Sequence, residues 1–427
     1  MNYEETLEYL FHKLPMFSRI GDVAIKKDLT NTLLLCDFLE NPPTKFKTIH
    51  IAGTNGKGSV AHILASILQE AGYKTGLYTS PHLLDFRERI KINGKPCEEK
   101  YVIKFTEKIQ AKIEEIQPSF FEITVAMAFD YFAENKVDIA IIETGLGGRL
   151  DSTNVIHPVL SVITNISYDH QYLLGNTLPE IAFEKAGIIK SETPVVIGRK
   201  DKETAEVFIK KSNEQNAPIL FADDIVSQWK AVNTPKFLIV DALVDGKPEN
   251  VCCDLQAAYQ IENIKTVLAA LHALSKYNLL EVKEKAIQTG FSNVRKNTQL
   301  LGRWQLLETN PRVIVDVGHN EDGVKKILEQ LKIEHYQQLH IIYGAVKDKD
   351  INNILELLPK NAMYYFTEPQ MPRKLDVNTL FEKAKEHQLN GIVCNHPKVA
   401  LGIAKSKAHP QDLILVMGSF FVVNEIL

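Results

Sequence analysis

The seven residues Gly53-Thr54-Asn55-Gly56-Lys57-Gly58-Ser59 combine three glycines, one lysine and hydroxyl groups, which is a combination suited to holding phosphate. In a phosphate-binding loop, backbone N–H groups wrap the phosphate oxygens, the lysine neutralises the terminal phosphates, and a hydroxyl follows at the start of a helix. Lys57 and Ser59 supply the last two parts, although Gly58 separates them where the usual motif has no spacer. The stretch therefore predicts a site for ATP or GTP, and a tight turn with spare glycines is the structural alternative.

A dinucleotide-binding loop is the competing interpretation, because Gly56-x-Gly58-x-x-Ala61 fits its loose fingerprint. That fold needs an acidic residue about 20 positions later, at the end of the second strand, to bind the ribose. Here the second strand ends Leu77-Tyr78-Thr79-Ser80, without an acid. A dinucleotide site also has no use for a lysine between the glycines, so we favour the phosphate loop of a nucleotide-binding domain.

Three further polar groups follow or interrupt apolar runs. Glu143 ends an apolar strand and is followed by glycines at 145, 147 and 148, while Asp169-His170 follows another such strand. Ligands bind at the carboxyl edge of parallel sheets, so these side chains are candidates for a metal site. A solvated glutamate and a structural histidine are the alternatives. Lys185 stands in the apolar stretch IAFEKAGIIK, where a lysine either extends to solvent or has chemistry.

Alternating apolar strands and amphipathic helices must position these groups, and this alternation predicts a parallel sheet covered by helices on both faces. The expected strands are Thr48–Ala52, Lys74–Thr79, Asp138–Glu143, Val159–Ile166 and Pro194–Ile197. The expected helices are Ser59–Ala71, Tyr101–Ile116, Phe120–Glu134, Leu178–Ile189, Glu203–Asn213 and Gln260–Ser275. Lys230–Pro248 reads as a hairpin on this domain.

The pattern restarts after a polar segment without clear periodicity, Asn293 to Leu301. The expected strands there are Arg312–Val317, Leu339–Tyr343, Met363–Thr367, Ile392–Cys394 and Leu413–Met417, and the expected helices are Glu321–Lys332, Ile351–Leu358, Thr379–His387 and Val399–Ser406. The prediction is an α/β protein with a P-loop parallel-sheet ATPase domain at residues 1–295, followed by a smaller Rossmann-like α/β domain at residues 300–427.

Composition excludes several classes of protein. The formal net charge of −4 over 427 residues argues against a dedicated nucleic-acid binder, which would carry a basic surplus. No apolar run reaches the ~18 residues of a membrane helix, and the acidic N-terminus MNYEETLEYLFHKLP is unlike a secretory signal. The five cysteines have no CxxC spacing, which is typical of reduced thiols in a cytoplasmic protein.

Six motifs in order carry a resemblance to a known family. They are GTNGKGS, TSPHL…F.ERI.ING (residues 79–94), ETGLGGRLDSTN, TNI..DH…LG, EKAGIIK and GR…D.GHN. Together they resemble folylpolyglutamate synthase/dihydrofolate synthase of the Mur ligase superfamily, nearly end to end, from the SRIG near Arg19 to the GSFFVV near Ser419. The resemblance implies an ATP-dependent ligase that phosphorylates a pterin-linked carboxylate, after which L-glutamate attacks the acyl phosphate.

The resemblance also implies roles for residues of the first domain. The ATP phosphates are assigned to Gly53, Thr54, Asn55, Gly56, Lys57, Gly58 and Ser59, and one or two Mg²⁺ ions to Ser80, Glu143 and His170. Lys185 matches the lysine that this family carbamylates with CO₂. The substrate, dihydropteroate or a reduced folate, is assigned to Phe120, Phe121, Glu122 and Asp151. An aromatic pair such as Phe120-Phe121 is otherwise more often part of a core.

In the second domain the family form DGAHNP is here DVGHN, which retains Asp316 and His319. The resemblance assigns Asn263, Arg303 and Asp316 to ATP, and places His319 near the incoming glutamate, with Ser419 among the substrate residues. It makes Lys57, Lys185 and His319 the catalytic candidates. Without the family pattern, Asp316 could equally be a helix N-cap.

Two other functions compete with this one. A murein peptide ligase shares the loop but carries an additional N-terminal UDP-binding domain, and only about 50 residues precede the loop here, too few for one. A nucleotide-dependent switch would lack the polar set of the second domain, whereas Arg303, Asp316 and His319 are present. We expect small-molecule substrates, no nucleic-acid or membrane partner, and a monomer. The sequence leaves open whether dihydropteroate, folate or both are accepted.

Overall fold

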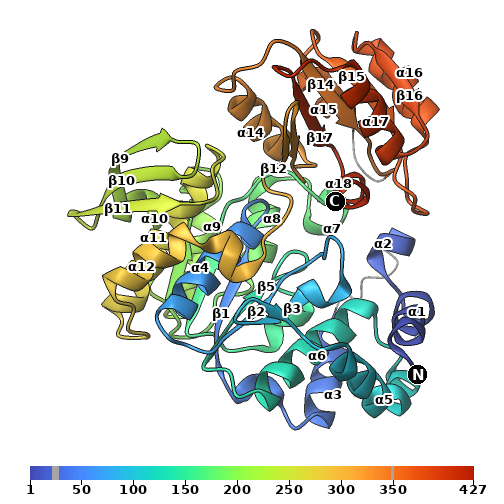
Figure 1. The fold of residues 1–427 in the computed structure, drawn as a ribbon. Helices are drawn as coiled ribbons and strands as arrows, with labels where there is room; N and C mark the ends of the chain where they lie inside the picture. Colours follow the sequence, from blue (N-terminus) through green and yellow to red (C-terminus); the bar gives the residue numbers. More distant parts are fainter. Residues whose placement is uncertain (22–27, 348–350) are drawn as a thin grey trace. The chain divides into compact units, whose positions relative to one another are not determined.

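The computed structural model describes residues 1–21, 28–347 and 351–427, which form two compact units. The larger unit contains Met1–Phe17, Asp22–Gln256 and Gln260–Leu300. The smaller unit contains Leu301–Leu427 together with two short segments from earlier in the chain, Ser18–Gly21 and Ala257–Tyr259. Each unit is an α/β structure built on its own sheet (Figure 1).

The sheet of the larger unit has eight strands in the order β4-β3-β2-β5-β1-β6-β7-β8. The strands are β1 Lys47–Ala52, β2 Thr75–Tyr78, β3 Ile90–Ile92, β4 Lys95–Pro96, β5 Ile139–Glu143, β6 Leu160–Ile163, β7 Val195–Ile197 and β8 Ile219–Phe221. Six strands, β2, β5, β1, β6, β7 and β8, run parallel to one another. The other two, β3 and β4, are added antiparallel at the β2 edge. Central β1 lies between β5 and β6, so its carboxyl end lies next to theirs.

Helices cover both faces of this sheet. Along β5, Ile139 and Ile141 enter one core with α4 and α11, while Ala140 and Ile142 enter another with α5 and α6. The helices of this unit are α1 Tyr3–Lys13, α3 Thr30–Phe38, α4 Lys57–Glu70, α5 Glu99–Ile116, α6 Phe120–Glu134, α7 Gln171–Leu174, α8 Leu178–Ala186, α9 Ala205–Glu214, α10 Ala222–Ile225, α11 Gln260–Lys276, α12 Glu284–Ser292 and α13 Val294–Thr298. The short helix α2, Phe17–Ile20, begins in the larger unit, and its last three residues are assigned to the smaller one. The predicted two-faced architecture is confirmed.

Two segments differ from the sequence expectation. The expected hairpin is a three-stranded antiparallel sheet, β9 Val226–Asn233, β10 Leu238–Val244 and β11 Lys247–Cys253, whose buried residues join the core of α11 and α12. The polar segment after Asn293, for which the sequence shows no clear periodicity, contains the short helix α13. Val294 and Thr298 of α13 are buried, and a five-residue helix is too short to show a periodicity.

The smaller unit has a six-stranded sheet in the order β12-β13-β17-β14-β15-β16, in which only the edge strand β12 is antiparallel to its neighbour. Its strands are β12 Gln305–Thr309, β13 Arg312–Val315, β14 Leu339–Tyr343, β15 Met363–Thr367, β16 Gly391–Cys394 and β17 Leu413–Met417. Its helices are α14 Glu321–Leu331, α15 Asn352–Leu357, α16 Val377–Glu386, α17 Pro397–Lys407 and α18 Phe420–Ile426. The predicted parallel α/β unit is confirmed, with β12 and α18 added.

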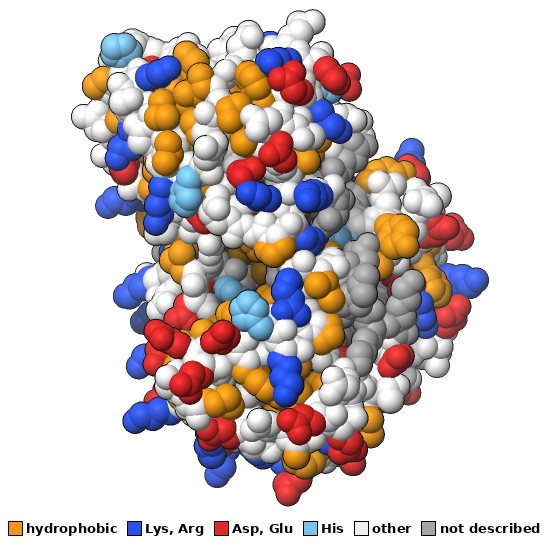
Figure 2. Space-filling view, turned by 90° about the vertical axis from the view of Figure 1, so that its right-hand side faces the viewer, with side chains coloured by type: hydrophobic (Ala, Val, Ile, Leu, Met, Phe, Trp, Pro, Cys, Tyr) orange, Lys and Arg blue, Asp and Glu red, His pale blue; other side chains and the backbone are white. Residues whose placement is uncertain are grey.

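The cysteines, the helix lengths and the surface charges bear on the composition of the chain. All five cysteines are free thiols. Within the described ranges, none of the helices combines the length and apolarity needed to cross a bilayer. On the face drawn in Figure 2, acidic and basic side chains are interspersed.

Candidate functional site

The glycine-rich loop joins the carboxyl end of β1 to α4, as the sequence predicts. Gly53 and Gly56 have φ values of +147° and +85°, and a Cβ atom at either would overlap a neighbour, Thr164 Oγ1 at Gly53 and Asn263 Oδ1 at Gly56. Glycine is therefore required at both positions for conformation and for space. α4 then begins at Lys57, so the first N–H groups of a helix follow the loop directly. This is the arrangement of backbone groups that binds phosphate.

The end of β6 holds the loop in place. Asn165 accepts a hydrogen bond from Thr54 N at 2.9 Å through its carbonyl and one from Asn55 N at 2.9 Å through Oδ1. The Asn55 carbonyl in turn accepts from Thr164 Oγ1 at 2.6 Å and from Asn165 Nδ2 at 3.1 Å. Four bonds from two consecutive residues fix the loop backbone before any ligand binds.

Two lysines donate to the same loop carbonyl. Lys57 Nζ lies 3.0 Å from Gly53 O and 3.1 Å from Thr54 O, and Lys185 Nζ lies 2.8 Å from Gly53 O. Lys185 is 3% exposed, and burial, with a smaller contribution from the positive charge of Lys57, lowers its pKa to about 7. Glu184 pairs with Arg149 at 2.9 Å instead, which argues against a simple Lys185–Glu184 surface pair.

The candidate metal ligands lie in segments that follow β2 and β6 or, for Glu143, at the end of β5 itself. Glu143 is 5% exposed at the end of β5, and its Oε2 accepts from Ser80 N at 3.3 Å, so the structure brings these two residues together. His170 lies after β6 at the start of α7, where its ring makes an edge contact with Phe17 at 5.8 Å. In the described parts of the chain, no group of three or more His, Cys, Asp and Glu side chains is arranged to hold a metal ion.

The amino end of α11 also contacts the loop. Asn263, 5% exposed, lies against Gly56, and its Nδ2 donates to Gln260 Oε1 at 2.7 Å. Gln260 is fully buried and its Nε2 donates to Ser59 Oγ at 3.3 Å. Asn263 is predicted from the sequence by the family resemblance, whereas Gln260 is not, because a glutamine at the start of a helix carries no pattern of its own.

The proposed pterin residues have different surroundings. Phe120 is buried in the core beside Phe11 and Phe86, whereas the ring of Phe121 lies against Gly145, at which a Cβ would come within 2.5 Å of it. Glu122 is 2% exposed and belongs to the capping box of α6, accepting from Ser119 N at 2.6 Å. Phe121 thus lies beside the glycine-rich turn after β5, while Phe120 and Glu122 shape the helix that carries it.

Asp151 organises that same turn. Its carboxylate accepts from Leu146 N at 2.8 Å, Thr153 N at 3.0 Å and Thr153 Oγ1 at 2.5 Å. Because Thr153 Oγ1 donates to Asp151, it accepts from His50 Nε2, 2.8 Å away on β1. Burial raises the pKa of Asp151 and lowers that of His50 to about 3, so His50 is neutral at physiological pH.

In the smaller unit, Asp316 follows β13 and is 3% exposed. It accepts from Tyr259 Oη at 2.5 Å, Trp304 N at 2.8 Å and Gly318 N at 2.8 Å, while burial raises its pKa. The N-cap of α14 is Asn320, so the alternative of Asp316 as that cap is excluded.

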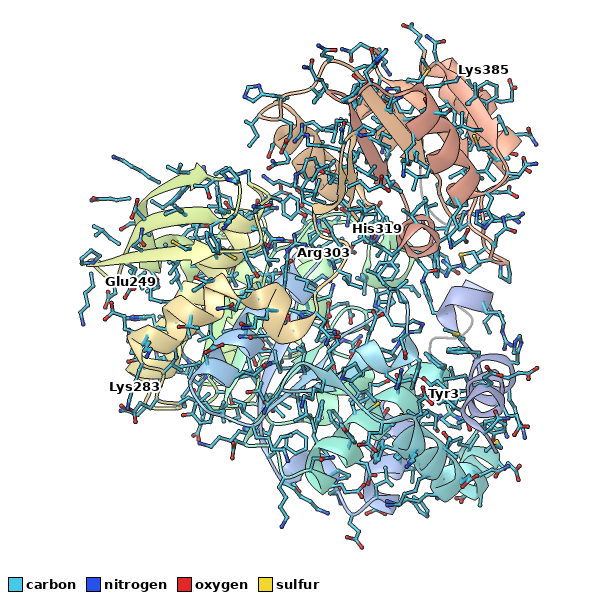
Figure 3. The ribbon with its side chains drawn as sticks, viewed as in Figure 1. Tyr3, Glu249, Lys283, Arg303, His319 and Lys385 are labelled. Carbon is cyan, nitrogen blue, oxygen red and sulfur yellow. The ribbon has the colours of Figure 1, made fainter. Side chains whose placement is uncertain are left out.

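Three more proposed residues belong to this unit. The positive charge of Arg303 partly offsets the increase that burial causes in the pKa of Asp316, and His319 Nδ1 lies 3.0 Å from Val317 O. Figure 3 labels Arg303 and His319 on the same side of the unit. Ser419 is buried and its Oγ caps α18, accepting from Phe421 N at 3.3 Å.

Comparisons with known proteins agree on one family. The Mur ligase middle domain matches residues 51–271, and the Mur ligase glutamate ligase domain matches residues 302–420. The dihydrofolate synthase/folylpolyglutamate synthase of Bacillus subtilis is 33% identical over 413 residues, covering 94% of this chain and 95% of that protein. Solved structures agree. The E. coli enzyme FolC in complex with DHPP and ADP has a TM-score of 0.86 and 29% identity, over 100% of this chain and 97% of that chain. A Yersinia pestis bifunctional folylpolyglutamate synthase/dihydrofolate synthase complexed with AMPPNP and Mn ion has a TM-score of 0.83 and 27% identity, over 100% and 97%.

Proposed function

The chain belongs to the Mur ligase family, and on that premise we infer that it is an ATP-dependent ligase that joins L-glutamate to a pterin-linked carboxylate. The substrate is a reduced folate and also dihydropteroate, so the enzyme combines folylpolyglutamate synthase and dihydrofolate synthase activities, as the named relatives do. The observation that carries this function is the loop between β1 and α4, held by β6 and contacted by two lysines.

The chemistry proceeds by two displacements. A carboxylate oxygen of the substrate bonds to the γ-phosphorus of ATP and the bond to the β-phosphate oxygen breaks, which releases ADP and leaves an acyl phosphate. The glutamate amine then attacks the carbonyl carbon, loses a proton, and phosphate leaves with the former carboxylate oxygen. Positioning and charge neutralisation dominate such a reaction.

Lys57 supplies the side-chain cation of the loop. In the structure its ammonium is bonded to the carbonyls of Gly53 and Thr54, so it exchanges these partners for phosphate oxygens when ATP binds. The rigid backbone from Thr54 to Gly56 presents its N–H groups to the phosphates. Asn263, Arg303 and Asp316 contribute further contacts to the nucleotide, and His319 and Ser419 serve the glutamate side.

The metal is one or two Mg²⁺ ions, which neutralise phosphate charge when bound. The Glu143 carboxylate and the Ser80 hydroxyl are oxygen ligands of the kind Mg²⁺ prefers, and the two residues are adjacent. His170 is the third proposed ligand, supported by the family resemblance. Phe121 and Asp151 are the proposed contacts of the pterin ring, with Phe120 and Glu122 behind them.

Lys185 is carbamylated in this proposal. A neutral amine attacks the carbon of CO₂, a new N–C bond forms, and the amine loses a proton to solvent. Burial and a pKa of about 7 favour that neutral amine. The product is an anion beside the loop, which can orient the groups around the phosphates.

We assign ATP and pterin binding to residues 1–295 and glutamate ligation to residues 300–427, in a cytoplasmic monomer.

A single assay tests the function. The purified protein is supplied with ATP and Mg²⁺, with dihydropteroate, tetrahydrofolate or a muramoyl peptide, and with or without L-glutamate; phosphate release and product mass are measured. We expect glutamate-dependent phosphate release and a product longer by one or more glutamates. ATP binding without ligation would favour the nucleotide switch, and turnover only with a muramoyl peptide would favour the peptide ligase.

A further inference from the structure

Two consecutive residues bind different parts of the proposed machinery. Tyr259 is the last residue of the short segment that belongs to the smaller unit, and Gln260 is the first residue of α11 in the larger unit. A single peptide bond joins them, and consecutive Cα atoms are about 3.8 Å apart. The contacts on either side of this bond therefore have no slack chain between them.

On the side of the larger unit, Gln260 uses both ends of its amide. Its Nε2 donates to Ser59 Oγ at 3.3 Å and its Oε1 accepts from Asn263 Nδ2 at 2.7 Å. Asn263 is thereby oriented with its Oδ1 against Gly56. Gln260 is 0% exposed, and the two hydrogen bonds of its amide hold the side chain in one position. Gln260 thus acts on the phosphate loop through two other residues.

On the side of the smaller unit, three residues before this bond are fixed. Ala257 is 1% exposed in the core, Ala258 N donates to Gln330 Oε1 at 2.7 Å, and Tyr259 Oη donates to Asp316 Oδ2 at 2.5 Å. A hydrogen bond to a carboxylate is among the stronger ones in proteins. Tyr259 therefore restrains Asp316, and it is itself restrained by the core around it.

We propose that Gln260 and Tyr259 are a coupled pair of positioning residues that link the geometry of the phosphate loop to that of the Asp316 carboxylate. This inference rests on the proposed ligase function. A displacement of the loop moves Ser59 and Asn263, hence Gln260, and through one peptide bond Tyr259 and its carboxylate partner. Neither side chain needs to touch substrate for this role.

Three variants test the coupling with the ligase assay above. Gln260→Met removes the amide, Tyr259→Phe removes only the hydroxyl, and a glycine inserted between the two keeps both side chains but lengthens the path. We expect each to lower kcat roughly tenfold, because the loss of one buried hydrogen bond has about this effect and the insertion breaks the same linkage. The double variant Gln260→Met/Tyr259→Phe should have a kcat no lower than that of the more impaired single variant, because the same linkage is broken in all of them.

Matched controls separate this effect from damage elsewhere. Tyr101→Phe removes a similar bond, from Tyr101 Oη to Asp130 Oδ2 at 2.7 Å, and a glycine added beside exposed Gly246 lengthens an open turn. Both should keep kcat within about twofold, well under the loss expected for a hydrogen bond to a charged group. A double variant whose loss is the product of the single losses would overturn the coupling, since the two residues would then act independently.

The result for the variant with the inserted glycine can be interpreted only if that variant folds. If the inserted variant melts without a cooperative transition, the double-variant comparison alone decides between coupling and independence. If it folds and keeps full kcat, the coupling is refuted. A wild-type protein that does not ligate glutamate would refute the proposed function instead, so the two failures are distinguishable.

Discussion

Replacing Lys185 by Met should change how stability depends on pH. Burial lowers the Lys185 pKa from 10.5 to about 7 in the folded protein. Between these values the unfolded state holds a proton on this lysine that the folded state does not. Stability therefore rises with pH across this window, because the unfolded state binds more protons. The contribution is most unfavourable below pH 7 and vanishes above pH 10.5.

The expected change in the free energy of unfolding follows from the difference between the unfolded and folded pKa values of Lys185. It corresponds to about 5 kcal/mol in full, at ~1.4 kcal/mol per pH unit. From pH 7.5 to 9.5, the wild-type protein should gain roughly 2–3 kcal/mol in free energy of unfolding relative to Lys185→Met. Other buried groups, such as Lys91 with a pKa lowered to about 8 by burial, are present in both proteins and cancel in the difference.

Urea unfolding in CO₂-free buffer measures this difference. The protein has two tryptophans, Trp229 in the larger unit and Trp304 in the smaller, so a Trp304→Phe background leaves one reporter in the unit that contains Lys185. A difference between wild type and Lys185→Met that does not change with pH would refute the reasoning, since the lysine would then titrate as a solvated group.

The same pKa sets the supply of the reactive amine. With a pKa of about 7, a large share of the Lys185 side chains is neutral at pH 7.5, against about one in a thousand for a solvated lysine. With ¹³C-bicarbonate, a carbamate signal should appear in wild type and be absent in Lys185→Met. We expect Lys185→Ala to lose most ligase activity and to recover part of it with a short carboxylic acid. An unmodified amine whose removal leaves turnover intact would eliminate carbamylation.

Four other perturbations probe the site and the two units. Lys57→Ala should lower kcat about 10²- to 10³-fold with an unchanged circular dichroism spectrum, because it removes the loop's side-chain cation; normal turnover and an unchanged KM for ATP would contradict the loop assignment. Gly56→Ala places a Cβ onto Asn263 at a φ of +85°, so the KM for ATP should rise at least about tenfold; an unchanged KM would mean that the loop is not the ATP site. Glu143→Gln should raise the Mg²⁺ concentration for half-maximal activity more than about fivefold, and an unchanged Mg²⁺ titration would remove Glu143 from the metal site. ATP with a substrate analogue should make the protein more compact and reduce its radius of gyration in small-angle scattering. Identical scattering curves with and without these ligands would contradict a ligand-induced compaction.

The strand, loop and helix around Lys57 are predictable because their signals are local. An apolar run, glycines and an amphipathic helix follow each other within 20 residues, and the structure places β1 and α4 there. The same holds for Lys185, whose apolar neighbours in the sequence already indicate burial. Such features depend on residues close to one another in the chain.

The groups that hold the site in place are not predictable in this way, because their partners are distant in sequence. Gln260 and Ser59 are separated by 201 positions, and Thr164 and Asn55 by 109. His50 reads as an ordinary strand residue until Thr153, 103 positions away, is seen beside it. One sequence contains no signal for such pairs, since propensity and periodicity describe only neighbours.

The short segment Ala257–Tyr259 limits how this protein could have been assembled or could be re-engineered. A fragment beginning at Leu301 would lack Ala257 and Tyr259 from its core and would leave Asp316 without one of its three hydrogen-bond donors. A single crossover at residue 300 would therefore separate Ala257–Tyr259 from the rest of the smaller unit. A chimera that keeps residues 257–259 and 301–427 from one parent but residues 260–300 from the other needs three junctions, before Ala257, after Tyr259 and before Leu301.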